Sequence, residues 1–302
     1  MIPEFPEFKK LELSDKEDVE VFTKKFPPYS DFNFVSMWSW DIKGEMRLSQ
    51  LNNNLVVRFT DYLTGDPFFS FLGDNEVNDT IKKLLEFSKS EGLRIKLKLI
   101  PECSIKNADI TKYNIKEDED NSDYIYNVQL ISEYKGASFS DKRNNVNHFV
   151  KSFPKIYVEL LNLKDPATQK NILKLDKEWL ANKIEKKGCF EIKNEQSAIK
   201  RFFQSEKENT IGIGIFDNKQ FLGYSIIEVL SGGYSICHFS KADIHIHDIY
   251  DFLMKESCKI LRSQNCSFLN YEQDLGLPGL RYTKRSFRPI NFFKKLIVCS
   301  SK

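Results

Sequence analysis

Alternating and helically spaced apolar positions predict one set of structural elements in the first third of the chain. Two short strand-like runs meet at Asn52 to Asn54 and have the pattern of a hairpin, because Asn tolerates the backbone of tight turns. A third strand, an amphipathic helix and a strand with period-two alternation follow. The runs are residues 46–51, 55–61, 68–73, 76–92 and 94–102.

The same order of elements returns in the second half of the chain. A hairpin with its turn at Asn218–Lys219 precedes a strand, an amphipathic helix and a further strand. The runs are residues 210–217, 220–230, 234–241, 247–264 and 267–271. Hairpin, strand, crossover helix and strand in this order resemble the core of the GNAT acyltransferase fold. We therefore expect an α/β (α+β) protein built from two tandem GNAT-like acyltransferase units with mixed central sheets.

The stretch between the two copies suggests where the units divide. Its most polar run, residues 116–123, is typical of a linker or an exposed loop. We expect an N-terminal unit over residues 1–122 and a C-terminal unit over residues 123–302. The second unit should carry a helical insertion at about residues 138–207, because this region has helical spacing of apolar residues.

Composition and charge exclude several classes of protein. The 302 residues are 41% hydrophobic and 29% charged, which excludes wholesale disorder and fibrous proteins. A net charge of +2 argues against generic coating of nucleic acid. However, residues 275–302 hold seven basic residues and no acidic one, so the rest of the chain is mildly acidic. A basic end on an acidic body suggests a localised anion site.

Cysteine usage and hydropathy favour a cytoplasmic protein. The six cysteines are widely spaced and form no CxxC pair, which is typical of reduced, buried thiols. No run reaches the roughly 18 apolar residues of a membrane-spanning helix. The N-terminus also lacks the apolar core of a secretory signal. We expect no transmembrane segment, while peripheral contact with a membrane stays open.

The segment at residues 270–289 carries the strongest chemical signal. Glu272 and Asp274 follow the last predicted strand, where the substrate sites of α/β sheets tend to lie. Gly276 and Gly279 permit tight turns and close approach of the backbone. The cations that follow suit phosphate groups. They are Arg281, Lys284 and Arg285. The alternative is a basic surface helix whose cations form salt bridges with the two preceding carboxylates.

A second basic cluster lies at the predicted start of the first inserted helix. Ser138 and Asp141 fit a capping box there. The amides and the dipole of a helix N-terminus favour anions. The cluster consists of Lys135, Lys142, Arg143 and Asn144. The alternative is an ordinary solvated helix start.

Metal and hydrolase chemistry have less support in the sequence. A capping or loop role is favoured for His238, His245 and His247, because no carboxylate or thiol completes a metal site at a suitable spacing. We therefore predict no metal. The chain also lacks the GxSxG nucleophile elbow of a serine hydrolase.

Two motifs resemble one known family. The stretches YIYNVQLISEYKGASFSDKRNNVNHF and NYEQDLGLPGLRYTKRSFRP are similar to the signature of the family named for the C-terminal domain of phosphatidylglycerol lysyltransferases. Many members of that family are stand-alone bacterial proteins. The resemblance spans about residues 10 to 297 and implies a tandem GNAT-like fold, which the Fem aminoacyltransferases share.

The resemblance implies transfer of an acyl group, often aminoacyl from a charged tRNA, to a hydroxyl or an amine. The positions that match the two motifs are Lys135, Lys142, Arg143, Asn144, Glu272, Asp274, Gly276, Gly279, Leu280, Arg281 and Lys284. We expect Glu272 to act as the catalytic base, with Asp274 as the second candidate and Tyr282 as an acid. Arg281 and Lys284 would hold the phosphates of the donor, with help from Lys142 and Arg143 of the second basic cluster.

The sequence leaves the donor open between acyl-CoA and an aminoacyl-tRNA. GNAT enzymes hold the CoA pyrophosphate on a glycine-rich loop, and the corresponding residues 241–248 contain no glycine, which favours tRNA or another phosphate-bearing donor. The modest net charge instead favours a small ligand. The alternative function is a non-catalytic module that binds a phosphate ligand or RNA.

Overall fold

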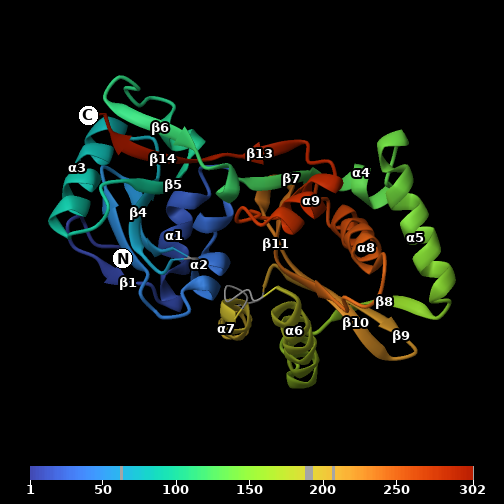
Figure 1. Cartoon of the computed structure of the whole chain (residues 1–302). Coiled ribbons are helices and arrows are strands. Elements are labelled where there is room, and N and C mark those ends of the chain that lie inside the picture. Colours follow the sequence, from blue (N-terminus) through green and yellow to red (C-terminus); the bar gives the residue numbers. More distant parts are fainter. Residues whose placement is uncertain (62–63, 188–192, 206–207, 302) are drawn as a thin grey trace. The chain divides into compact units, whose positions relative to one another are not determined.

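The computed structural model describes residues 1–61, 64–187, 193–205 and 208–301. These residues form two seven-stranded sheets with helices packed on them, a mixed α/β fold (Figure 1). One unit consists of residues 1–123, 273–281 and 292–302, and the other of residues 124–272 and 282–291. Residues 188–192 and 206–207 of the expected helical insertion lie outside the described residues.

The sheet of the first unit has the order β1-β2-β3-β4-β5-β14-β6. Its strands are β1 (Lys9–Lys10), β2 (Arg47–Leu51), β3 (Asn54–Thr60), β4 (Pro67–Leu72), β5 (Leu97–Pro101), β14 (Lys295–Ser300) and β6 (Tyr113–Glu117). The pair β4–β5 is parallel, and the other neighbours are antiparallel. The predicted hairpin is confirmed, with Asn52 and Asn53 at φ 53° and 58°, the backbone of a tight hairpin turn.

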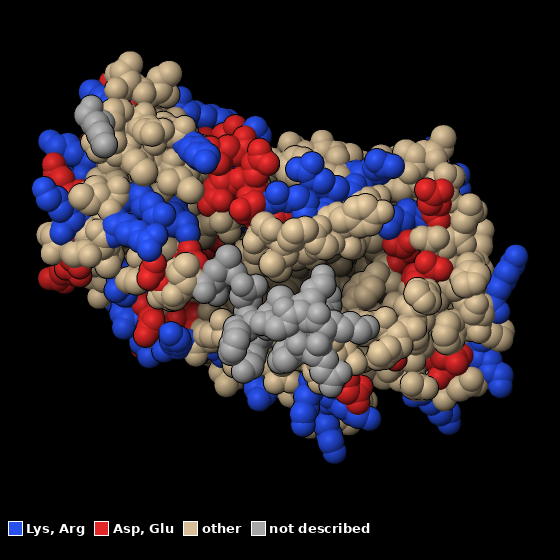
Figure 2. Space-filling view, in the orientation of Figure 1, with Lys and Arg blue, Asp and Glu red and all other residues tan. Residues whose placement is uncertain are grey.

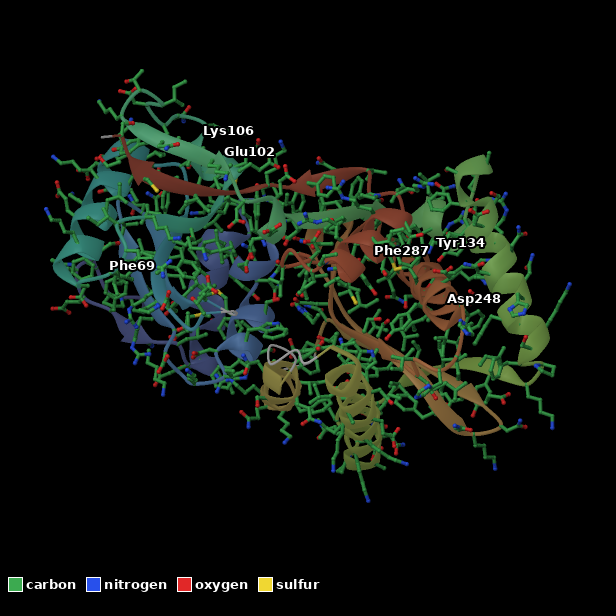
Figure 3. All side chains as sticks on the ribbon, viewed as in Figure 1. Phe69, Glu102, Lys106, Tyr134, Asp248 and Phe287 are labelled. Carbon is green, nitrogen blue, oxygen red and sulfur yellow. The ribbon has the colours of Figure 1, made fainter. Side chains whose placement is uncertain are left out.

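The core of the first unit lies between this sheet and α3 (Val77–Ser90). Phe69 of β4, labelled in Figure 3, is buried with Ile81 and Leu84 of the helix. The helices α1 (Lys16–Thr23) and α2 (Phe34–Trp40) complete the unit. The predicted strand at residues 94–102 begins later than its alternation suggests, because Ile95 is 47% exposed and precedes the first paired residue.

The sheet of the second unit has the order β13-β7-β12-β11-β10-β9-β8. Its strands are β13 (Asn291–Phe293), β7 (Asp123–Asn127), β12 (Phe268–Asn270), β11 (Tyr234–Ala242), β10 (Gln220–Val229), β9 (Thr210–Asp217) and β8 (Ile156–Leu161). The hairpin of β9 and β10 turns at Asn218 and Lys219, both at positive φ, as predicted. Strands β11 and β12 run parallel, and α8 connects them, so the expected order of elements occurs in both units.

Helices cover both faces of the second sheet (Figure 1). The helices with residues in the second unit are α4 (Val128–Glu133), α5 (Ser140–Ser152), α6 (Pro166–Lys187), α7 (Lys193–Phe202), α8 (Ile249–Ser263) and α9 (Pro278–Ser286). The apolar side of α8 is buried as its periodicity predicts, and α4 and α5 pack beside it. Phe202 of α7 packs on Phe239 of β11, so α7 covers the opposite face. Short 3-10 turns occur at Leu13–Asp15, Ser30–Phe32, Glu102–Ile105, Glu119–Asn121, Ala137–Phe139 and Ser231–Gly233.

At two points, consecutive strands of the chain belong to different sheets. Strand β7 follows β6 of the first sheet in sequence but belongs to the second sheet. The last strand, β14, returns to the first sheet and lies between β5 and β6. Each unit is therefore assembled from separate stretches of sequence.

The prediction of a linker or an exposed loop at residues 116–123 is wrong at both ends, and residues 116–117 belong to β6. Asp123 is fully buried and lies 2.6 Å from the ammonium of Lys295, which is also buried and pairs with Asp31. The polarity of a run does not reveal this, because the compensating cation is remote in sequence. The capping box of Ser138 and Asp141 is also wrong, since α5 begins at Ser140 after a residue without a side-chain cap.

Candidate functional site

A β-bulge in β11 defines the centre of the candidate site. In the β10–β11 ladder, Ile226 lies opposite Phe239 and Ile227 opposite Cys237, which leaves His238 as the extra residue. Adjacent residues of such a bulge direct their side chains to the same side of the sheet. His238 therefore points to the face covered by α7, where Phe239 packs.

Strands β11 and β12 separate beside this bulge. Their parallel pairing extends over three residues and ends at Ile236 and Asn270, although β11 continues to Ala242. Glu272 follows β12 with φ 54°, and its N–H donates to the side-chain oxygen of Asn270 at 2.8 Å. The left-handed backbone and this hydrogen bond direct Glu272 toward the bulge.

Two carboxylates flank the imidazole of His238. Its Nε2 lies 3.1 Å from Oε2 of Glu228, and its Nδ1 lies 3.7 Å from Oε1 of Glu272. Burial opposes the charged imidazole, but hydrogen bonds and the charges of the two carboxylates outweigh it and raise the pKa of His238 to about 9. The imidazole is therefore protonated at neutral pH. Glu272 is the more exposed carboxylate, at 16% against 9% for Glu228.

Lys284 supports the residue before Glu272. It is 5% exposed, and its ammonium donates to the carbonyl oxygen of Tyr271. The same ammonium lies 5.1 Å from the ring centroid of Tyr271 and 5.8 Å from that of Tyr124, which are cation–π contacts. The predicted phosphate ligand Lys284 is thus a buried lysine that contacts the backbone beside the candidate base.

The residues Asp274 and Arg281 form an ion pair within the first unit. Asp274 is fully buried, and both of its oxygens accept hydrogen bonds from Arg281 at 2.8 Å. Arg281 also pairs with Asp120 at 2.5 Å. The N–H of Gly276 donates to Asp274 at 2.8 Å, and the positive φ of 70° suits glycine. For Arg281, the structure therefore shows the salt bridges that the sequence left as the alternative.

The second basic cluster also has internal partners, which lie in the second unit. Lys142 pairs with Asp251 of α8 at 2.7 Å and lies 4.1 Å from the ring centroid of Phe287. Arg143 donates to the carbonyl oxygen of Gly136 at 2.6 Å and to that of Tyr134, the residue that ends α4. Figure 3 labels Tyr134 and Phe287 in this part of the molecule.

Four of the predicted residues and two histidines are exposed. Lys135 and Asn144 lie at the surface near α5, and Gly279 and Tyr282 lie on α9. Tyr282 is 79% exposed. His245 and His247 occupy the exposed loop before α8, as predicted.

No group of three metal-ligating side chains occurs within the described ranges. Figure 2 shows side chains of both signs intermixed over the face in view.

The partners of Glu272 were not predicted from the sequence. A loop role for His238 is wrong, because the residue is buried in β11 and its partner Glu228 lies on β10. The sequence does contain a signal: Glu228 directly follows Ile226 and Ile227, and His238 lies between Cys237 and Phe239, so each polar residue is next to apolar residues inside a predicted strand. A buried charge in a strand interior needs a partner, which points to the neighbouring strand.

The order of strands and helices in the two units, and the parallel strands β11 and β12 whose pairing ends at the candidate site, identify the class of protein. Each unit contains a hairpin, a strand, a crossover helix and a parallel strand, the GNAT-like acyltransferase core, in tandem. A family model described as "Phosphatidylglycerol lysyltransferase, C-terminal" matches residues 23–299. The chain belongs to this family, as the two motifs predicted.

Solved structures of similar proteins share the whole fold. A conserved protein of unknown function from Bacteroides thetaiotaomicron is 23% identical, with a TM-score of 0.83 over 100% of both chains. The C-terminal domain of a putative lysylphosphatidylglycerol synthetase from Agrobacterium fabrum is 12% identical, with a TM-score of 0.66 over 96% of this chain and 93% of that one. L-PGS from Bacillus licheniformis is 13% identical, with a TM-score of 0.62 over 99% and 94%.

One curated protein is also similar in sequence. An uncharacterized protein of Mycoplasmoides gallisepticum is 23% identical over 190 residues, which are 62% of this chain and 59% of that protein. The match thus covers less than two thirds of the relative. Within the part of the chain that the structure describes, no helix is long and apolar enough to cross a membrane.

Proposed function

We propose that this protein is an acyltransferase that moves an acyl or aminoacyl group from an activated donor to an amine or a hydroxyl. The family and the tandem GNAT-like fold support acyl transfer. The observation that carries the proposal is the Glu228–His238–Glu272 cluster at the point where β11 and β12 separate. Perturbed titratable groups at the end of a strand are typical of catalytic sites.

In the proposed reaction, Glu272 is the general base. The acceptor nitrogen or oxygen attacks the carbonyl carbon of the donor ester or thioester, and its proton passes to the carboxylate of Glu272. As the bond from carbon to the leaving oxygen or sulfur breaks, that proton returns to the leaving group. The protonated His238 keeps the carboxylate oriented and holds a positive charge beside it.

The donor is proposed to carry phosphate, as in acyl-CoA or an aminoacyl-tRNA. Lys135 and Asn144 are exposed and form candidate phosphate contacts at the surface of the second unit. Lys142, Arg143, Arg281 and Lys284 have protein partners, so in this proposal they position the segments that carry the site. Asp274 has both oxygens engaged, which favours Glu272 as the base.

A donor screen followed by one substitution tests the proposal. Purified protein is incubated with acyl-CoA thioesters and with aminoacyl-tRNAs, together with amine and hydroxyl acceptors, and the products are measured by mass spectrometry. Glu272→Gln should lower turnover about 100-fold with unchanged donor binding, the usual size of a general-base effect. Glu159→Gln, an exposed strand glutamate of the same unit, is the matched control.

The results of these assays distinguish an enzyme from a non-catalytic module that binds a phosphate ligand or RNA. Loss of turnover in Glu272→Gln but not in Glu159→Gln supports the assignment. Equal turnover of wild type and Glu272→Gln contradicts the role of Glu272. Binding of RNA that weakens steeply with salt, without any transfer product, contradicts the enzymatic function altogether.

A further inference from the structure

A cavity of about 330 Å³ lies within the first unit, and every described residue that lines it belongs to that unit. A volume of this size is in the range of small-molecule sites. The walls come mainly from β4 and β5 with the segments before them, and from the turn after β6. The Glu228–His238–Glu272 cluster belongs to the second unit, so the cavity is a separate feature of the molecule.

Charged side chains of both signs line this cavity. They are the cations Arg94, Lys96 and Lys98 and the carboxylates Asp61, Asp66, Asp118 and Asp120. Most of these side chains form ion pairs. The pairs are Lys98–Asp61, Arg94–Asp66 and Asp120–Arg281. One cation and one carboxylate of the lining, Lys96 and Asp118, are left over.

Lys96 and Asp118 form no ion pair with each other or with another residue in the part of the chain that the structure describes, although they line the same cavity. Asp118 accepts a hydrogen bond from the neutral side-chain amide of Asn121 at 2.8 Å. Both side chains are half-buried, so each charge is partly withdrawn from water without an opposite charge beside it. A ligand that supplies both opposite charges would remove this cost.

The backbone is fixed at both positions. The N–H of Asp118 donates to the carbonyl oxygen of Lys295 at the start of β14, at 2.8 Å. Lys96 directly precedes β5, whose first residue, Leu97, pairs with Phe69 of β4. A ligand would therefore meet groups whose backbone is already ordered, which lowers the entropic cost of binding.

Apolar side chains complete the lining of the cavity. Phe68 of β4 is 7% exposed and Leu99 of β5 is 3% exposed, and Leu275 and Ile297 lie in the same lining. An aliphatic group that contacts them would be removed from water, which favours binding. A phosphate with two negative charges suits the cavity less, because four carboxylates line it.

We propose that this cavity binds a small zwitterion, a molecule with one carboxylate, one ammonium and an aliphatic group. The carboxylate of the ligand accepts a hydrogen bond from Nζ of Lys96, and its ammonium donates to the carboxylate of Asp118. The aliphatic group contacts Phe68 and Leu99. An aliphatic α-amino acid has this combination of groups. The proposal goes beyond acyl transfer, since it assigns a ligand to the unit that does not contain the Glu272 cluster.

Calorimetric titration of the full chain with L-leucine and two analogues tests the site. Isocaproate has the same carbon skeleton without the ammonium, and isopentylamine lacks the carboxylate. L-leucine should bind with a Kd below about 1 mM. It should bind about tenfold tighter than either analogue, because each analogue lacks one charge-assisted hydrogen bond.

Two substitutions separate the contributions of the two charged ends. Lys96→Gln should remove the advantage of L-leucine over isopentylamine but keep its advantage over isocaproate, and Asp118→Asn should do the opposite. Neither substitution breaks an ion pair among the described residues, so both variants should fold. Lys82→Gln and Asp74→Asn, at exposed positions of the same unit outside the cavity, are the matched controls and should leave every affinity unchanged.

Three results would overturn the proposal. The first is equal affinity for L-leucine and both analogues, or no binding of L-leucine below about 1 mM. The second is unchanged affinity for L-leucine in both Lys96→Gln and Asp118→Asn. The third is the loss of both advantages in a single variant, which contradicts the assignment of the two charged ends to separate residues. The measured quantity is binding alone, so each result is independent of whether the protein transfers an acyl group.

Discussion

The protonated imidazole of His238 makes the free energy of unfolding depend on pH. The substitution His238→Gln should remove this dependence. The imidazole is 1% exposed between two carboxylates, and its pKa is about 9 in the folded protein, against an ordinary 6.5. A group whose pKa is raised by folding contributes stability that is complete below pH 6.5 and is lost as the pH rises through 9. At about 1.36 kcal/mol per pH unit, that interval corresponds to about 3 kcal/mol.

Urea unfolding followed by circular dichroism between pH 6 and pH 10 measures this contribution. The free energy of unfolding of the wild type should fall by about 3 kcal/mol relative to His238→Gln across this range. The other basic and acidic groups are common to both proteins, so their titrations cancel in the difference. His148→Gln is the control, because His148 is 70% exposed and pairs with Asp248 at the surface, where ion pairs contribute little.

A constant difference between wild type and His238→Gln from pH 6 to pH 10 would refute the reasoning. It would mean that the imidazole is neutral in the folded protein, and that Glu228 and Glu272 do not act on it as charges. NMR titration of the imidazole resonances gives an independent measurement. A midpoint near 9 is expected in the wild type, and a clearly lower midpoint in Glu228→Gln, because that substitution removes the nearer carboxylate.

Two further predictions concern the first unit. Lys295→Met should lower the free energy of unfolding by about 3–5 kcal/mol, because it leaves two buried carboxylates without their cation. Lys294→Met, at an exposed ion pair, should cost much less in the same urea assay, and equal losses would contradict the argument. Gly276→Ala should lower the melting temperature more than Gly92→Ala. Both glycines have φ near 70°, but a Cβ at Gly276 would lie 2.9 Å from a carboxylate oxygen of Asp120, whereas one at Gly92 meets nothing within 4 Å.

Local patterns in the sequence were sufficient to predict most of the strands and helices. Asn52 and Asn53 revealed the first hairpin because their side chains tolerate the left-handed backbone. The apolar spacing of α8 revealed its buried side, since periodicity depends only on neighbouring residues. The repeated order of elements then followed from these local patterns, and with it the GNAT-like fold.

Features that depend on pairing between distant residues could not be predicted in this way. The bulge that turns His238 toward Glu228 is a property of the β10–β11 register, which the sequence of β11 alone does not determine. Arg281 was predicted as a phosphate ligand because its neighbours are basic, yet it contacts Asp120, 161 residues earlier in the chain. Charge clustering in sequence shows where cations are, but not which carboxylates the fold brings to them.

The return of β14 to the first sheet affects the order in which the protein can be completed. During synthesis, β5 and β6 leave the ribosome long before the strand that lies between them. The edge of β5 therefore stays open until residues 295–300 emerge, and closing it requires a contact of high sequence separation. Loss of β14 would for this reason destabilise the first unit before the second. Chains that stall before β14 is made would expose an unpaired strand edge, which favours aggregation.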